Sequence, residues 1–84
     1  MKSNSLHQFR PVGLVMHDLG QYRVVHSVEE TAEVLLREWP ADDGEDFCEA
    51  VKTCFEGMHD KATPDAVRAA LIKAAREVNV MVIE

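Results

Sequence analysis

The stretch from Thr63 to Glu84 constrains the fold most, because it joins a complete helix pattern to an apolar strand pattern. Thr63 and Pro64 suit the N-cap and first helical positions, where a proline sacrifices no hydrogen bond. Apolar residues then recur at helical spacing: Val67, Ala70, Leu71, Ala74, Ala75 and Val78. Asn79 suits the position after the helix, and residues 80–83 form an apolar run of strand length. We therefore expect the upstream segments to pack against this unit.

Two strands are predicted near the start of the chain. Residues 12–16 are apolar, and residues 21–26 alternate around Tyr22 and Val24. Gly20 suits the turn between them, because a tight hairpin often needs a positive φ. We expect residues 1–8 to form a flexible tail and residues 9–84 to form a single domain.

Two further helices are predicted between the strands. Ser27 and Glu30 have capping-box spacing, and Trp39-Pro40 should end the first helix. Its predicted core stripe is Val28, Ala32, Leu35, Leu36 and Trp39. The stripe of the second helix is Phe47, Ala50, Val51, Cys54, Phe55 and Met58. Val34 and Ile72 are the apolar residues that fall on polar helix faces.

The predicted element order is β-β-α-α-α-β, which indicates an α+β fold. We expect a three-stranded, mainly antiparallel sheet whose central strand is the first. The second strand should pair on one side of it and the last strand on the other. The helices should pack mainly on one face of this sheet.

The charge of the chain is uneven. The net charge is −6, and residues 29–60 hold eleven acidic and two basic residues, a local charge of −9. Such a surface repels phosphate backbones and anionic lipids. We therefore expect neither nucleic acid nor a membrane as a partner.

No spacing of residues nominates a catalytic, cofactor or metal site. The acidic run 42–46 fails the calcium-loop spacing and suits a helix N-terminus, with Asp43 as a possible cap. Cys48 and Cys54 lie about 9 Å apart along one predicted helix, beyond disulfide reach. They are most simply reduced thiols of a cytoplasmic protein, with Cys54 in the core and Cys48 at the edge of the stripe.

Several sequence features occur in the order found in one family. These are Trp39-Pro40, Ala50, Cys54 and the run from Val67 to Glu77. With them, residues 9 to about 83 resemble a family of short alphaproteobacterial proteins of unknown function. Val67 stands where that family usually has alanine, and Leu71 where it has phenylalanine. The resemblance supports the fold and implies no site.

Two functions are compatible with these features. The favoured one is a non-catalytic interaction or regulatory module that forms a homodimer through its sheet. Alternation places Leu14, Met16, Tyr22 and Val24 on one face and Val15 with Val25 on the other. If the helices cover the first face, Val15 and Val25 are exposed, and Ile72, between two arginines, provides a secondary contact.

The alternative function is a metabolite-binding or accessory enzymatic domain. Its cleft would lie near Trp39 and Cys48, at the boundary between helices and sheet. A concave pocket lined by both side chains would favour this reading.

Overall fold

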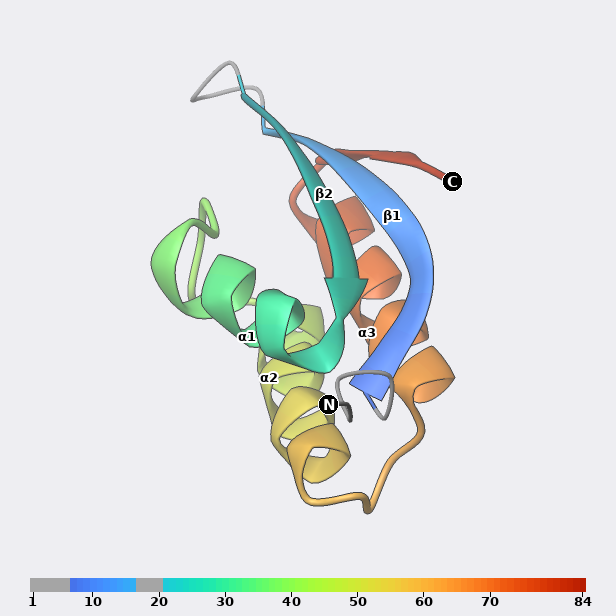
Figure 1. Cartoon of the computed structure of the whole chain (residues 1–84). Coiled ribbons are helices and arrows are strands. Elements are labelled where there is room, and N and C mark those ends of the chain that lie inside the picture. Colours follow the sequence, from blue (N-terminus) through green and yellow to red (C-terminus); the bar gives the residue numbers. More distant parts are fainter. Residues whose placement is uncertain (1–6, 17–20) are drawn as a thin grey trace.

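The computed structural model describes residues 7–16 and 21–84, which form three strands and three helices (Figure 1). In chain order these are β1 (Gln8–Met16), β2 (Gln21–Ser27), α1 (Val28–Arg37), α2 (Glu45–Met58), α3 (Pro64–Glu77) and β3 (Met81–Ile83). The α+β class and the order β-β-α-α-α-β are confirmed. The turn predicted at Gly20 lies outside the described residues.

The sheet has the predicted topology, with β1 between β2 and β3 and both pairings antiparallel. β1 is longer than the sequence pattern indicated, because it begins at Gln8 rather than at Val12. Gln8, assigned to the predicted tail, is therefore part of the sheet. Residues 1–6 of that tail lie outside the described residues.

The helices lie on one face of the sheet (Figure 1). α3 packs against β1 and β3, while α1 packs against β2. α2 packs chiefly against α3 and then against α1. The core between these elements includes Val12, Leu14, Val25, Val28, Val67 and Leu71, all fully buried. Within residues 7–16 and 21–84, no helix combines the length and apolar character that crossing a membrane requires.

Local capping explains where α1 and α3 begin. The Ser27 hydroxyl accepts a hydrogen bond from the Glu30 amide at 3.1 Å, and the Thr63 hydroxyl accepts one from the Ala66 amide at 3.1 Å. The Glu30 carboxylate accepts from the His26 amide at 2.8 Å, one residue before the position that a standard capping box uses. The caps predicted at Ser27 and Thr63 are therefore confirmed.

The end of α3 is also as predicted. Asn79 has a left-handed φ of 61°. The Val80 amide donates to the Ala75 carbonyl at 2.9 Å, and the Asn79 amide donates to the Arg76 carbonyl at 3.3 Å. These two bonds form a Schellman motif, which turns the chain from the helix into β3.

The start of α2 differs from the prediction. Asp43 does not cap this helix, because the N-cap residue is Gly44 and makes no side-chain hydrogen bond. Instead, the Glu77 carboxylate at the end of α3 accepts from the amides of Asp46 at 3.1 Å and Phe47 at 3.2 Å. A tertiary contact thus satisfies two amides that a local cap would otherwise satisfy.

α1 presents a different face to the core than its sequence pattern indicated. Its buried residues are Val28, Thr31, Val34 and Leu35. Leu36, predicted in the core, is 61% exposed, whereas Val34, predicted on the polar face, is fully buried. The hydroxyl of Thr31 is satisfied by donating to the Ser27 carbonyl at 2.9 Å. The helix is therefore rotated about its axis relative to the predicted stripe.

Candidate interaction surfaces

One face of the sheet is left uncovered by the helices (Figure 1). In the β1–β2 pair, Val15 lies opposite Tyr22 and Gly13 opposite Val24. In the β1–β3 pair, the same two β1 residues lie opposite Met81 and Ile83. Residues directly opposite in a sheet share a face. We call these six residues the open sheet face: Gly13, Val15, Tyr22, Val24, Met81 and Ile83.

The open sheet face is strongly apolar and accessible. Tyr22, Val24, Met81 and Ile83 are each between 46% and 59% exposed, and Val15 is half-buried. Tyr22 lies across Gly13, since a Cβ added at that glycine would come within 2.5 Å of the tyrosine hydroxyl. The absence of a side chain at Gly13 thus lets the tyrosine ring lie on the sheet.

Two of the three predicted interface residues are buried rather than exposed. Val25 is fully buried, because it pairs with Val12 on the face that the helices cover. Ile72 is also buried, at 8% exposure. Its neighbour Arg68 reaches the sheet, donating to the Arg10 carbonyl at 2.9 Å, so this flank of α3 faces inward. Val15 does lie on the open sheet face.

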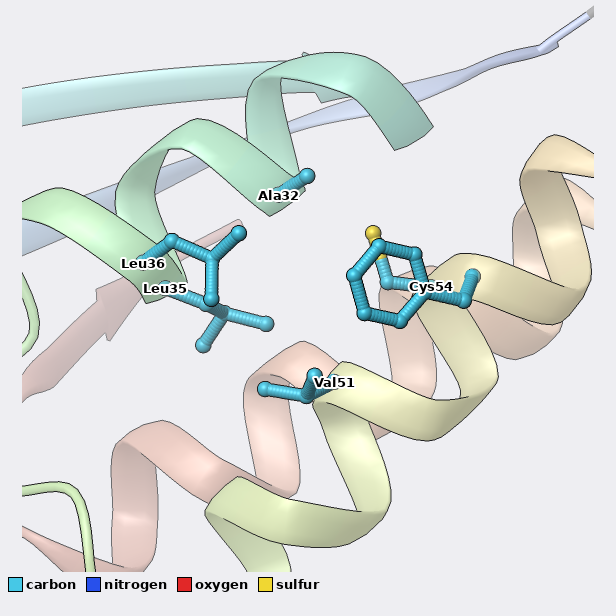
Figure 2. A pocket seen from close by; sticks show the side chains of 6 residues that line it. Ala32, Leu35, Leu36, Val51 and Cys54 are labelled. Atoms are coloured by element: carbon cyan, nitrogen blue, oxygen red, sulfur yellow. The ribbon is translucent and has the colours of Figure 1, made fainter.

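A second apolar surface lies where α1 and α2 meet (Figure 2). We call it the α1–α2 surface and define it by Ala32, Leu36, Val51 and Phe55. Leu36 is 61% exposed and Phe55 is 46% exposed. The crevice between them is floored by Leu35 and Cys54 and is too narrow for a water molecule. Both exposed residues were predicted to be in the core.

Two wider hollows adjoin the α1–α2 surface, and Leu36 lines both. One, of about 360 Å³, is bordered by Glu29 and Glu33. The other, of about 510 Å³, lies beside Trp39 and Asp42 at the end of α1. Leu36 is therefore a ridge between two depressions.

The predicted cleft near Trp39 and Cys48 is present only in part. Trp39 is half-buried against the core and lines the 510 Å³ hollow, but Cys48 does not line it. The Trp39 Nε1 atom is buried and has no hydrogen-bond partner among residues 7–16 and 21–84. Because it is buried, this donor is not presented to a molecule in the hollow. The two residues of the alternative site therefore do not line this hollow together.

The cysteines occupy the environments that the helix pattern predicted. Cys48 is exposed and Cys54 is buried, and both are free thiols. The Cys54 Sγ atom donates to the Val28 carbonyl at 3.2 Å, which ties α2 to the start of α1. Burial, with a smaller contribution from the negative charge of Glu29, raises the pKa of the Cys54 thiol to about 11. Such a thiol is protonated at neutral pH and is a poor nucleophile.

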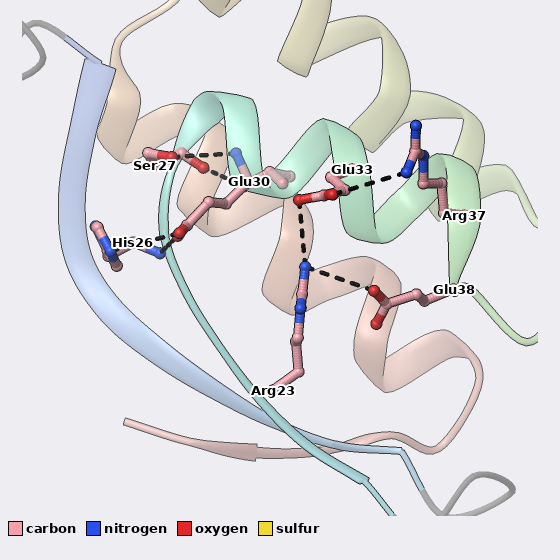
Figure 3. A network of polar contacts seen from close by, with 8 residues as sticks. Arg23, His26, Ser27, Glu30, Glu33, Arg37 and Glu38 are labelled. Atoms are coloured by element: carbon pink, nitrogen blue, oxygen red, sulfur yellow. Dashed lines mark hydrogen bonds and ion pairs between the residues drawn. The ribbon is translucent and has the colours of Figure 1, made fainter.

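A polar network joins β2 to α1 (Figure 3). The Arg23 guanidinium lies 3.3 Å from Glu33 and 3.5 Å from Glu38. Glu33 also lies 4.0 Å from Arg37. These contacts hold the edge strand against the helix.

His7 joins three parts of the chain. Its Nδ1 atom lies 2.6 Å from the Glu29 carboxylate at the start of α1, and its Nε2 atom lies 3.0 Å from the Asp60 carboxylate after α2. Hydrogen bonds to Asp60 and then to Glu29 raise the pKa of His7 above its usual value. Only the doubly protonated ring donates to both carboxylates. Among the residues that the structure describes, no three His, Cys, Asp or Glu side chains form a group able to hold a metal ion.

Sequence reasoning missed both His7 and the exposure of Leu36 and Phe55. The sequence did contain a signal for the exposure of Leu36 and Phe55. The apolar residues of α1 and α2 cover a wider arc of each helix than a single contact face needs. No local pattern pointed to His7, because its partners are distant in the sequence.

The fold and these surfaces define a small α+β domain with two exposed apolar areas. The chain belongs to a family described as "Protein of unknown function (DUF982)", whose model matches residues 10–82. The resemblance seen in the sequence is thereby confirmed as membership of a family without an assigned activity. Neither a curated protein nor a solved structure matches the chain.

Proposed function

We propose that this protein is a non-catalytic interaction module that self-associates through its open sheet face. The observation that carries the proposal is the exposure of four large apolar side chains, Tyr22, Val24, Met81 and Ile83, on one face of the sheet. Contiguous apolar area of this kind marks an interaction surface in soluble proteins.

The composition of the open sheet face supports a second copy as its partner. No charged residue occurs among the six cross-strand positions that define it. Two copies can therefore meet face to face without burying an unpaired charge. A two-fold dimer is the commonest closed arrangement, and it uses the same surface on both subunits.

The proposal places the protein in the cytoplasm and assigns it neither a nucleic acid nor a membrane as partner. Free thiols at Cys48 and Cys54 support a reducing compartment. The net charge of −6 opposes binding to phosphate backbones and anionic lipids.

Analytical ultracentrifugation at tens of micromolar tests the proposal. We expect a species of about twice the 9.4 kDa chain mass, which dissociates on dilution. Val24→Glu should shift the protein to monomer, because it places a charge on the open sheet face.

Leu36→Glu is the matched control, since it adds the same charge at an exposed apolar residue of the α1–α2 surface. It should leave the association unchanged. A wild-type protein that stays monomeric at every concentration would show that the open sheet face does not mediate self-association. Equal loss of the dimer in both variants would contradict the assigned surface.

A further inference from the structure

We infer that the α1–α2 surface binds a basic amphipathic helix of a partner protein. This surface lies on the helical layer and is separate from the open sheet face. The inference therefore goes beyond the proposed self-association and does not depend on it.

The shape of the α1–α2 surface suits a helix. Leu36 forms a ridge with a hollow on each side, and both hollows are large enough to accept side chains. Helices pack by inserting the side chains of one into the spaces between the side chains of the other. A helix that spaces its apolar residues at i, i+3 or i+4, and i+7 places them on either side of such a ridge.

The backbone of this surface also favours a helical partner over an extended one. An added strand gains its affinity from unpaired backbone groups at a sheet edge. α1 and α2 satisfy their backbone groups internally, so the α1–α2 surface offers no such edge. A partner buried here must satisfy its own backbone hydrogen bonds, as a helix does.

Apolar contact would provide the binding energy. Leu36 and Phe55 together present the largest exposed apolar side chains of the helical layer. The crevice beneath them is too narrow for a water molecule, and a partner that covers Leu36 and Phe55 removes their exposed apolar surface from water. Ala32 and Val51 also line this crevice at the helix contact (Figure 2).

The acidic charge around the α1–α2 surface favours a partner of positive charge. Residues 29–60, which build this side of the molecule, carry eleven acidic and two basic residues. Glu29 and Glu33 border one hollow, Asp42 borders the other, and Arg37, which lies 4.0 Å from Glu33, borders both. Several other acids in this segment form no ion pair with any residue that the structure describes: Asp43, Glu45, Glu49 and Glu56. A helix with lysine and arginine beside its apolar stripe complements this potential.

The same charge argues against a second copy as the occupant. Two α1–α2 surfaces placed together would bring two acidic segments into contact, and like charges across an interface are costly. α3 of a second copy is not an alternative, because its large apolar residues, Val67, Leu71 and Ile72, are buried.

A synthetic peptide provides the test. The probe is a peptide of about 18 residues with leucines at i, i+4, i+7 and i+11, lysine and arginine beside this stripe, and alanine elsewhere to favour the helix. Its controls are a scrambled peptide of the same composition and a peptide in which glutamate replaces the basic residues. Binding is measured by fluorescence anisotropy at two salt concentrations, and the site is mapped by amide chemical shifts.

We expect the basic helix to bind, with affinity that falls as salt rises. The scrambled peptide should bind at least about tenfold more weakly, and the acidic peptide should not bind. The shifts should centre on Ala32, Leu36, Val51 and Phe55. Leu36→Gln should weaken binding by about tenfold or more, whereas Val24→Gln, at a 46% exposed residue of the open sheet face, should not.

Phe55→Gln is a second variant on the same surface, and it should weaken binding as Leu36→Gln does. Circular dichroism checks that each variant is folded. The inference is overturned if the scrambled peptide binds as well as the probe, because the contact would then be charge alone. It is also overturned if the probe fails to bind at low salt, or if shifts centre on Tyr22 and Val24. None of these outcomes affects the ultracentrifugation result, so the two proposals fail separately.

Discussion

At the scale of single residues, His7 is the clearest case of a side chain whose role depends on its protonation. It lies between two carboxylates, at 2.6 Å from Glu29 and 3.0 Å from Asp60, and both contacts favour the charged ring. The direction of its pKa shift therefore makes a prediction about stability and pH.

The pKa of His7 is higher in the folded than in the unfolded protein, where it is near 6.5. Its stabilising effect is therefore complete below that unfolded value and is lost as pH rises through the folded pKa. Urea unfolding between about pH 5 and 8.5, where the carboxylates stay ionised, measures this for wild type and His7→Gln. The difference in unfolding free energy should be largest at the acid end and shrink as pH rises. A difference that is constant, or that grows with pH, would contradict a stabilising role for the charged ring.

At the scale of helices and strands, the cap that Glu77 provides makes the start of α2 depend on the end of α3. Glu77→Ala removes both hydrogen bonds to the amides of Asp46 and Phe47 and a negative charge near the N-terminus of α2. We expect a loss of about 0.5–2 kcal/mol in the free energy of unfolding. Glu49→Ala, on the exposed face of α2, is the control and should change it by less than about 0.5 kcal/mol. Equal effects of both substitutions would mean that the cap contributes nothing.

Element types and two of the three helix starts were predictable because their signals are local, and the central position of β1 was predictable because residues 12–16 are apolar on both faces. Ser27 and Thr63 cap helices within three residues, and the apolar runs show where strands lie. The third helix start was not predictable, since its cap comes from a residue thirty positions away.

The faces of the strands were harder to predict, because alternation fixes which residues share a face only within one strand. Val15 was grouped with Val25, but β1 and β2 pair so that Val15 lies opposite Tyr22. A shift of one residue in a hairpin reverses every side chain of the second strand. The sequence thus predicted that one face of the sheet is open and apolar. Which β2 residues lie on that face depends on the register between β1 and β2, which the local sequence does not determine.

The faces of the helices were misjudged for a related reason. Val34 lies between Glu30 and Glu38 on the helix wheel, and Ile72 lies between Arg68 and Arg76. Glu30 accepts from the His26 amide and Glu38 pairs with Arg23, so both glutamates point toward β2. Charged side chains that reach the sheet look the same in a sequence as charged side chains that face water.

At the scale of the whole molecule, Cys54 reports on the stability of the assembled domain. It is 1% exposed, lies in the contact between α1 and α2, and has a pKa raised to about 11. α2 is in turn packed against α3, so exposing this thiol requires the helical layer to separate.

In a Cys48→Ser protein, which keeps only this thiol, labelling should be slow in buffer and accelerate steeply with urea. The free energy obtained from labelling should match that from circular dichroism, because opening at this site is global unfolding. The converse Cys54→Ser protein should label at once through the exposed Cys48. Rapid labelling of Cys54 that does not depend on urea would reveal a local opening of α2 instead.

The pairing of β3 with β1 has a consequence for the order in which the chain folds. β3 has three residues, and its partners Gly13, Leu14 and Val15 lie at the opposite end of the sequence. The α2–α3 hairpin and the β1–β2 hairpin are closed by short connections, whereas docking β3 closes almost the whole chain into a loop. We therefore expect β3 to join last, during synthesis as well as during refolding. Until β3 docks, the backbone groups at this edge of β1 are unpaired, and a strand of another chain can pair with them. Aggregation is therefore most favourable before β3 has joined the sheet.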